Sequence, residues 1–226
     1  MSAYKLNIMI IGSMPSMDKI VEAFKLYSTE TDSDFGVLNY EADGGNIVAT
    51  IYKKKLKTVR VVNLELRTVD VGEVDDVKLV SLKIMTDSKR IEVYTGTDSD
   101  RKLVTDFFSD ANLAIETSSP SVNLYKFATD FRASNKFSVP RIAGSEYVGS
   151  EEAQGEFVAK FSDSDKALEF LEGGHGSHAH TIKISFRAKF GKASITAHPD
   201  GCFAISCKEE DQDHLFDRVR NAIGVV

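Results

Sequence analysis

The chain has 226 residues, and its 28 Lys and Arg against 34 Asp and Glu give a formal net charge of −6 at pH 7. This length allows one large domain or two small domains of about 100 residues each. Hydrophobic residues at 42% and only 4 prolines exclude wholesale disorder. Because the chain is acidic overall, a surface that binds polyphosphate has to be local.

The N-terminal region and the cysteines indicate where the protein works. The longest apolar run near the N-terminus, residues 6–12, contains Asn7 and is too short for a membrane span or a signal peptide. Cys202 and Cys207 are five residues apart in a predicted strand, so they lie ~17 Å apart on opposite faces and cannot form a disulfide with each other. We expect an intracellular protein in a reducing compartment, with no membrane association.

The first half of the chain reads as a strand, a helix, an antiparallel series and a second helix. Residues 4–11 have the character of a buried strand, and Ser13-Met14-Pro15-Ser16 starts a helix with Ile20, Val21 and Phe24 on one apolar face. The helix after Thr97 places Leu103, Val104, Phe107 and Phe108 on one side. Between these helices, the predicted antiparallel strands are residues 35–41, 46–52, 58–67, 77–85 and 90–95.

The second half follows a similar order after a Ser/Pro linker at residues 117–121. Its predicted strands are residues 122–127, 181–190, 193–198 and 202–207, with helices at residues 165–171 and from Asp211 onward. Both halves end in strand, turn, strand and amphipathic helix. The sequence therefore predicts an α+β fold of two similar units, each with helices on one face of a sheet and the other face free.

Several short segments occupy equivalent places in the two halves. Asn7-Ile8-Met9-Ile10 and Asn123-Leu124-Tyr125-Lys126 each open a half. Phe35-Gly36-Val37-Leu38-Asn39-Tyr40 has a phenylalanine followed five residues later by a tyrosine, and Val93-Tyr94-Thr95-Gly96 ends the first series. Ala204-Ile205-Ser206-Cys207 matches that last segment loosely. This arrangement resembles the TATA-box-binding protein (TBP) family, and most closely its divergent versions in large DNA viruses.

The resemblance implies a saddle of two pseudo-symmetric repeats, a curved antiparallel sheet with helices on its convex face. The repeats would span residues 1–117, with an insertion at about 53–78, and 118–226, with an insertion at about 128–175. Such a protein would bind A·T-rich duplex DNA in the minor groove and recruit a general transcription factor or an RNA polymerase subunit, in the nucleus or cytoplasm of the host if it is viral. It would have no catalytic step and no cofactor. The implied DNA-binding residues are Asn7, Met9, Phe35, Met85, Val93, Thr95, Asn123, Tyr125, Thr181, His198, Ala204 and Ser206.

The chain departs from the family where an apolar ring wedges between base pairs. Of the four family phenylalanines only Phe35 is present, since Met85, Thr181 and His198 occupy the other places. Wedging needs an apolar side chain that can separate a base step, which Met85 could do and Thr181 could not. A TBP-like scaffold that binds proteins rather than DNA is therefore an alternative.

A glycine-rich histidine segment provides another alternative. His175, His178 and His180 have spacings that could bind zinc, and the surrounding glycines could hold a phosphate, as in a metal- or phosphate-binding enzyme. A surface loop has the same composition. Pairing through Gly191-Lys192 would place His198 opposite Ser185, ~17 Å from His180 and too far for a fourth ligand.

The dense basic run at residues 53–60 predicts a solvated loop or a local nucleic-acid surface.

Overall fold

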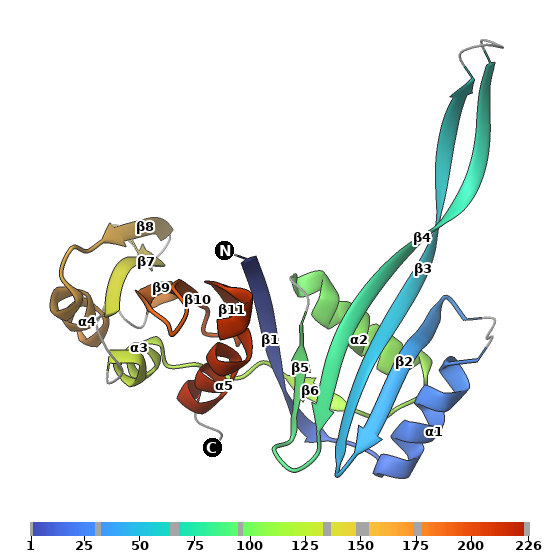
Figure 1. Cartoon of the computed structure of the whole chain (residues 1–226), viewed down its shortest axis with the longest axis horizontal. Helices are drawn as coiled ribbons and strands as arrows, with labels where there is room; N and C mark the ends of the chain where they lie inside the picture. The colour runs from blue at the N-terminus through green and yellow to red at the C-terminus, as the bar shows by residue number, and fades with distance from the viewer. Residues whose placement is uncertain are drawn as a thin grey trace. The chain divides into compact units, whose positions relative to one another are not determined.

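The computed structural model describes residues 2–29, 33–63, 68–94, 97–132, 137–147, 154–173 and 178–223 (Figure 1). The chain forms two compact units. Unit 1 contains Met1–Ile10, Tyr94–Gly96 and Ser118–Val226, and unit 2 contains Ile11–Val93 and Thr97–Thr117. Strand β1 (Ser2–Ser13) contributes its first residues to unit 1 and its last to unit 2. In the described part of the chain, the helices are too short or too polar to cross a membrane.

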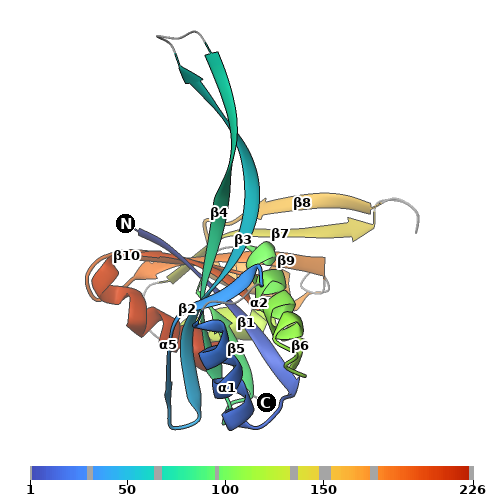
Figure 2. The ribbon, with the colours of Figure 1, turned by 90° about the vertical axis from the view of Figure 1, so that its right-hand side faces the viewer.

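Unit 2 is an antiparallel sheet with two helices on one face (Figure 2). Strands β2 (Phe35–Asp43), β3 (Asn46–Asn63), β4 (Thr68–Met85) and β5 (Arg90–Val93) are hydrogen-bonded in that order. Helices α1 (Met17–Tyr27) and α2 (Asp98–Asp110) meet through Phe24 and Phe107, whose ring centroids are 5.4 Å apart. Both rings are buried, as the apolar periodicity of the two helices predicts.

The β3–β4 hairpin is longer than the sequence analysis predicted. Its register runs from Asn46 opposite Met85 to Asn63 opposite Thr68, so the predicted break between residues 52 and 58 was wrong. Beyond Lys53 and Lys78, β3 and β4 pair with each other and with no other described strand, which makes an arm (Figures 1 and 2). The basic run is therefore a strand, and acidic residues of β4 lie across from it, as in the pair Lys55 and Asp76. The loop expectation for this run was also wrong.

Unit 1 holds the other strands of the same antiparallel sheet, which continues through β1, and three described helices. The first part of β1 is followed across the sheet by β11 (Cys202–Cys207), β10 (Lys192–Ala197), β9 (Ala179–Arg187), β7 (Phe137–Tyr147) and β8 (Gln154–Lys160). Its helices are α3 (Leu124–Arg132), α4 (Ser164–Glu172) and α5 (Gln212–Ile223), the last preceded by a short 3₁₀ turn at Glu209–Asp211. Apolar residues of these helices and of the strands form one buried cluster. The α+β class with an antiparallel sheet is confirmed.

One prediction for the second half was wrong. Residues 122–127, expected as a strand, lie at the start of α3, because Leu124, Phe127, Ala128 and Phe131 recur at helical spacing and are buried together. The Asn123 side chain accepts a hydrogen bond from the Lys126 backbone N–H at 2.9 Å and caps this helix. Strands β7 and β8 also fall within the region that the sequence analysis treated as an insertion.

Candidate functional site

One face of the unit 1 sheet packs against helices, and the opposite face is polar. Along β9, β10 and β11 the side chains alternate between buried and accessible, and the buried set belongs to the core. The accessible set includes Ser185, Ser194 and Ser206, and the strand register places them on the same side as Ala3 of β1. We call this polar side the open face of unit 1.

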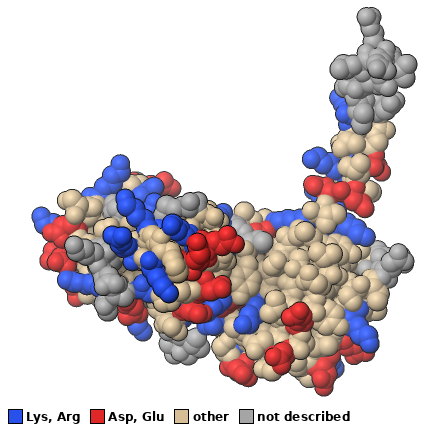
Figure 3. All heavy atoms as spheres, viewed as in Figure 1, with Lys and Arg blue, Asp and Glu red and all other residues tan. Residues whose placement is uncertain are grey.

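Cations gather on the open face. Five exposed Lys and Arg side chains belong to it, because the strand register pairs each of them with another residue on the same side of the sheet. They are Arg141, Lys160, Lys183, Arg187 and Lys192. Within the described chain, none of these five forms an ion pair with a carboxylate. Glu156 is the only acidic residue that the pairing of these described strands places on the same side. Figure 3 shows Lys and Arg gathered over the strands of unit 1.

The open face is also hollowed. A depression of about 770 Å³ lies over β7, β9, β10 and β11, and Lys183, Arg187 and Lys192 line it together with serines. Its lining combines small Ser, Gly and Ala side chains with these long cationic ones. A shallow, cationic depression with hydroxyl groups is suited to an extended anion, because it offers both charge and hydrogen-bond donors.

Six of the residues predicted to bind DNA belong to the open face by register or alternation. Ala204 and Ser206 are half-buried on β11, and Asn7 lies opposite Cys202. Asn7 is 0% exposed, and its neighbour in the alternation, Met9, is also buried. Thr181 and His198 are adjacent, with Thr181 Oγ1 3.4 Å from His198 Nδ1.

Three other predicted residues lie in the interior of unit 2. Phe35 and Met85 are each 7% exposed, and Val93 is fully buried. The Phe35 ring packs near Phe107 with centroids 6.3 Å apart. A side chain that fills its own core is not placed to separate base pairs, so neither Phe35 nor Met85 is positioned as a wedge in this structure. Thr95 falls outside the described residues.

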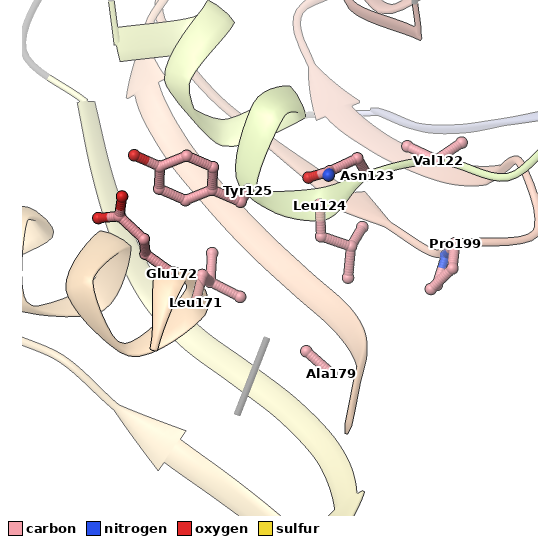
Figure 4. Close-up of a pocket in the computed structure, with 8 residues that line it drawn as sticks. All are labelled: Val122, Asn123, Leu124, Tyr125, Leu171, Glu172, Ala179 and Pro199. Carbon is pink, nitrogen blue, oxygen red and sulfur yellow. The ribbon is translucent and has the colours of Figure 1, made fainter. Parts of the chain in front are cut away.

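Asn123 and Tyr125 belong to the helix layer of unit 1. They line a second hollow of about 430 Å³ between the start of α3 and the end of α4, together with Leu171 and Glu172 (Figure 4). Because α3 packs on the core side of the sheet, these two side chains lie on the opposite layer from Ala204 and Ser206. Among the described residues that line this hollow there is no cation, and the ionisable ones are Glu172 and Tyr125.

The histidine segment is only partly described. His178 and His180 are exposed, whereas His175 lies outside the described residues. Among the residues that the structure describes, no three His, Cys, Asp or Glu side chains are grouped to hold a metal ion. The expected pairing of His198 with Ser185 was wrong, because Lys192 pairs with Arg187 and the whole register shifts; His198 instead lies beside Thr181.

The cysteines differ in environment. Cys207 is buried on the core side of β11, and this burial, with the nearby Asp211 carboxylate, raises the pKa of its thiol. A buried thiol with a raised pKa stays protonated at neutral pH and is a poor nucleophile. Cys202 is half-buried on the open face.

The cations of the open face were missed in the sequence analysis. Their signal was present, because Lys183, Ser185 and Arg187 alternate with apolar residues along one strand. The denser run at residues 53–60 drew attention instead, although Lys53 lies 3.8 Å from the Asp106 carboxylate and β4 supplies further acids. Which strands lie side by side decides where cations gather, and that depends on distant pairings such as Ser138 with Ser185.

No protein-family model matches this chain, and no match was found among curated proteins. The arrangement of the open face is therefore the basis for a functional assignment.

Proposed function

We propose that this protein binds duplex DNA through the open face of unit 1. The observation that carries the proposal is a set of five exposed cations without a carboxylate partner in the described chain, brought to one side of the sheet by β7, β8, β9 and β10. An acidic protein that keeps such a set unneutralised has a local surface for a polyanion. Contacts from Lys and Arg to phosphate oxygens would supply the affinity.

The resemblance to the TBP family supports transcription initiation as the process in which this binding occurs, with a general transcription factor or a polymerase subunit as partner. The repeated order of helix, antiparallel strands and terminal helix in the two halves is compatible with a two-repeat saddle. Since Phe35 and Met85 lie in a core, the proposal relies on contacts to the DNA backbone and not on wedging.

The test is a fluorescence anisotropy titration of a labelled 20-base-pair duplex at low salt. Lys183→Glu/Arg187→Glu should weaken binding by about 100-fold, because two phosphate contacts become repulsive. The matched control is Lys126→Glu/Lys166→Glu, which makes the same change in net charge on exposed residues of the helix layer. This control should bind within about twofold of wild type. Equal losses in both variants, or no binding by wild type, would contradict the proposal.

A protein-interaction scaffold is the second candidate, and the open side of the unit 2 sheet favours it. Val48, Val77 and Leu79 of β3 and β4 are each about half exposed there. Exposed apolar groups of this kind are typical of protein-docking surfaces. If wild type fails to bind DNA at low salt, we would expect Leu79→Ser to weaken co-purification of a transcription protein from host extract and Lys183→Glu to leave it unchanged.

A further inference from the structure

Four serines form a continuous row across the open face of unit 1. Ser138 lies opposite Ser185, Ser185 opposite Ser194, and Ser194 opposite Ser206. We call these four residues the serine row. Neighbouring strands in a sheet are ~4.8 Å apart, so the row spans ~14 Å perpendicular to the strands. Ala3 continues it on β1 opposite Ser206, which extends the small side chains to a fifth strand.

Three hydroxyls of the row are available to a ligand. Ser185, Ser194 and Ser206 are half-buried, and in the described part of the chain their side chains make no hydrogen bond. The Ser138 hydroxyl donates to the Ser185 backbone carbonyl over 3.4 Å. Hydroxyls on a sheet usually bond to water when nothing else is present, and they can instead donate to an anionic oxygen that reaches them.

Cations stand on both sides of the row. On one side, Lys183 is two positions from Ser185 and pairs with Arg141. On the other side, Arg187 is two positions from Ser185 and pairs with Lys192. Two residues along a strand correspond to ~6.8 Å. A Lys or Arg side chain is long enough to extend across that distance, whereas a serine side chain is short and rises little above the sheet. The row is therefore the base of the hollow of about 770 Å³, and the cations form its walls.

We propose that the serine row is a track for the phosphodiester backbone of one DNA strand. Phosphate oxygens would accept hydrogen bonds from the serine hydroxyls, and Lys183, Arg187 and Lys192 would neutralise their charge. This inference rests on the proposed DNA binding and adds the group that is recognised. The row offers neither an aromatic ring to stack on a base nor an amide to read a base edge, so it selects backbone and not sequence.

The test removes the hydroxyl groups of the serine row in the whole chain, keeps the Lys and Arg charges, and measures DNA affinity. Ser185→Ala/Ser194→Ala/Ser206→Ala should weaken binding of the 20-base-pair duplex by about 10- to 30-fold, because three hydrogen bonds to charged oxygens are lost. The slope of log affinity against log salt should stay as in wild type, since serine releases no counterions. Ser194→Leu, which fills the centre of the track, should weaken binding further. Ser121→Ala/Ser162→Ala, at exposed positions away from the row, is the matched control and should bind as wild type does.

The outcomes separate the two proposals. Wild-type affinity in the triple variant and in Ser194→Leu would overturn the track, while a loss in Lys183→Glu/Arg187→Glu would still support DNA binding through the face. Wild-type affinity in the charge-reversal variant would overturn both. If the triple variant is poorly folded by circular dichroism, Ser194→Ala alone decides, and an affinity equal to wild type would reject the track.

Discussion

At the scale of single residues, Asp100 is a buried charge of unit 2 that joins a helix to a strand. It is 3% exposed, accepts the Thr97 backbone N–H at 2.7 Å and forms an ion pair with Lys78. Burial raises the pKa of the Asp100 carboxyl, but Lys78 and the Thr97 hydrogen bonds lower it more, so the pKa lies below its ordinary value. The same carboxylate therefore starts α2 and attaches that helix to β4.

Asp100→Asn should reduce the free energy of unfolding by about 1–2 kcal/mol at pH 7, because charged hydrogen bonds to Lys78 and the helix start are lost. Since the folded-state pKa is depressed, this stabilisation is present above the ordinary Asp pKa and is lost as pH falls through the lower folded pKa. Urea denaturation from pH 7 to pH 3 should show the difference between variant and wild type shrinking below about pH 4. Glu22→Gln, at an exposed position of α1, is the control. A difference that stays constant to pH 3 would contradict this role.

At the scale of elements, Asn123 caps the start of α3, and variants of this residue distinguish a structural role from a DNA-binding role. Asn123→Ala should lower the free energy of unfolding by about 1 kcal/mol, whereas Asn123→Asp keeps a capping oxygen and should cost less. Chemical denaturation measures both changes. We expect the DNA affinity of both variants, measured well below their unfolding temperatures, to match wild type, because Asn123 lies on the helix layer. Loss of affinity in Asn123→Ala would restore it as a DNA contact.

The turn between β10 and β11 depends on one glycine. Gly201 has φ +84°, and a Cβ there would lie 2.3 Å from Pro120 Cγ. Gly201→Ala should destabilise the protein by about 1–3 kcal/mol, since the substitution combines backbone strain with a steric clash. Gly72→Ala is the matched control, because a Cβ at Gly72 would meet nothing within 4 Å. Thermal unfolding should show a lower Tm for Gly201→Ala alone; equal Tm values would contradict the argument.

Elements with strong local signals were predicted from the sequence. Helices with a clear apolar face, such as α5, and the Pro199-Asp200-Gly201 turn are encoded within a few residues. The alternation of β-branched and polar residues did not locate the ends of β3. In the sequence, Lys53 to Lys57 look like a break in the strand, and only their pairing with β4 in the structure shows that the strand continues. The open face could not be predicted from short stretches of sequence, because it depends on pairings such as that of Ser138 with Ser185, which are 47 positions apart. Nothing in the neighbourhood of either residue specifies that partner.

At the scale of the whole molecule, charge distribution matters more than net charge. The chain carries −6 overall, yet one face of unit 1 holds five cations, from four strands, that form no ion pair in the described chain. Long-range attraction to DNA is therefore weak, and binding has to come from short-range contacts that displace counterions. Such binding is sensitive to salt and tolerant of sequence, in contrast to minor-groove binding with wedges, which favours deformable A·T-rich steps.

These two modes make opposite predictions for end-labelled duplexes followed by energy transfer. For backbone binding by five cations, log affinity against log salt should have a slope of about −4, and Lys183→Ala/Arg187→Ala should reduce its magnitude by about two. A·T-rich and G·C-rich duplexes should bind within about threefold of each other. The end-to-end distance should stay unchanged, because the open-face side chains that the structure describes include no exposed Phe, Leu, Ile or Met that could unstack a base step. A strong A·T preference with a shortened end-to-end distance would instead mean that the protein bends DNA. Bending by wedged side chains would require residues that are now buried, such as Phe35 and Met85, to move to the surface.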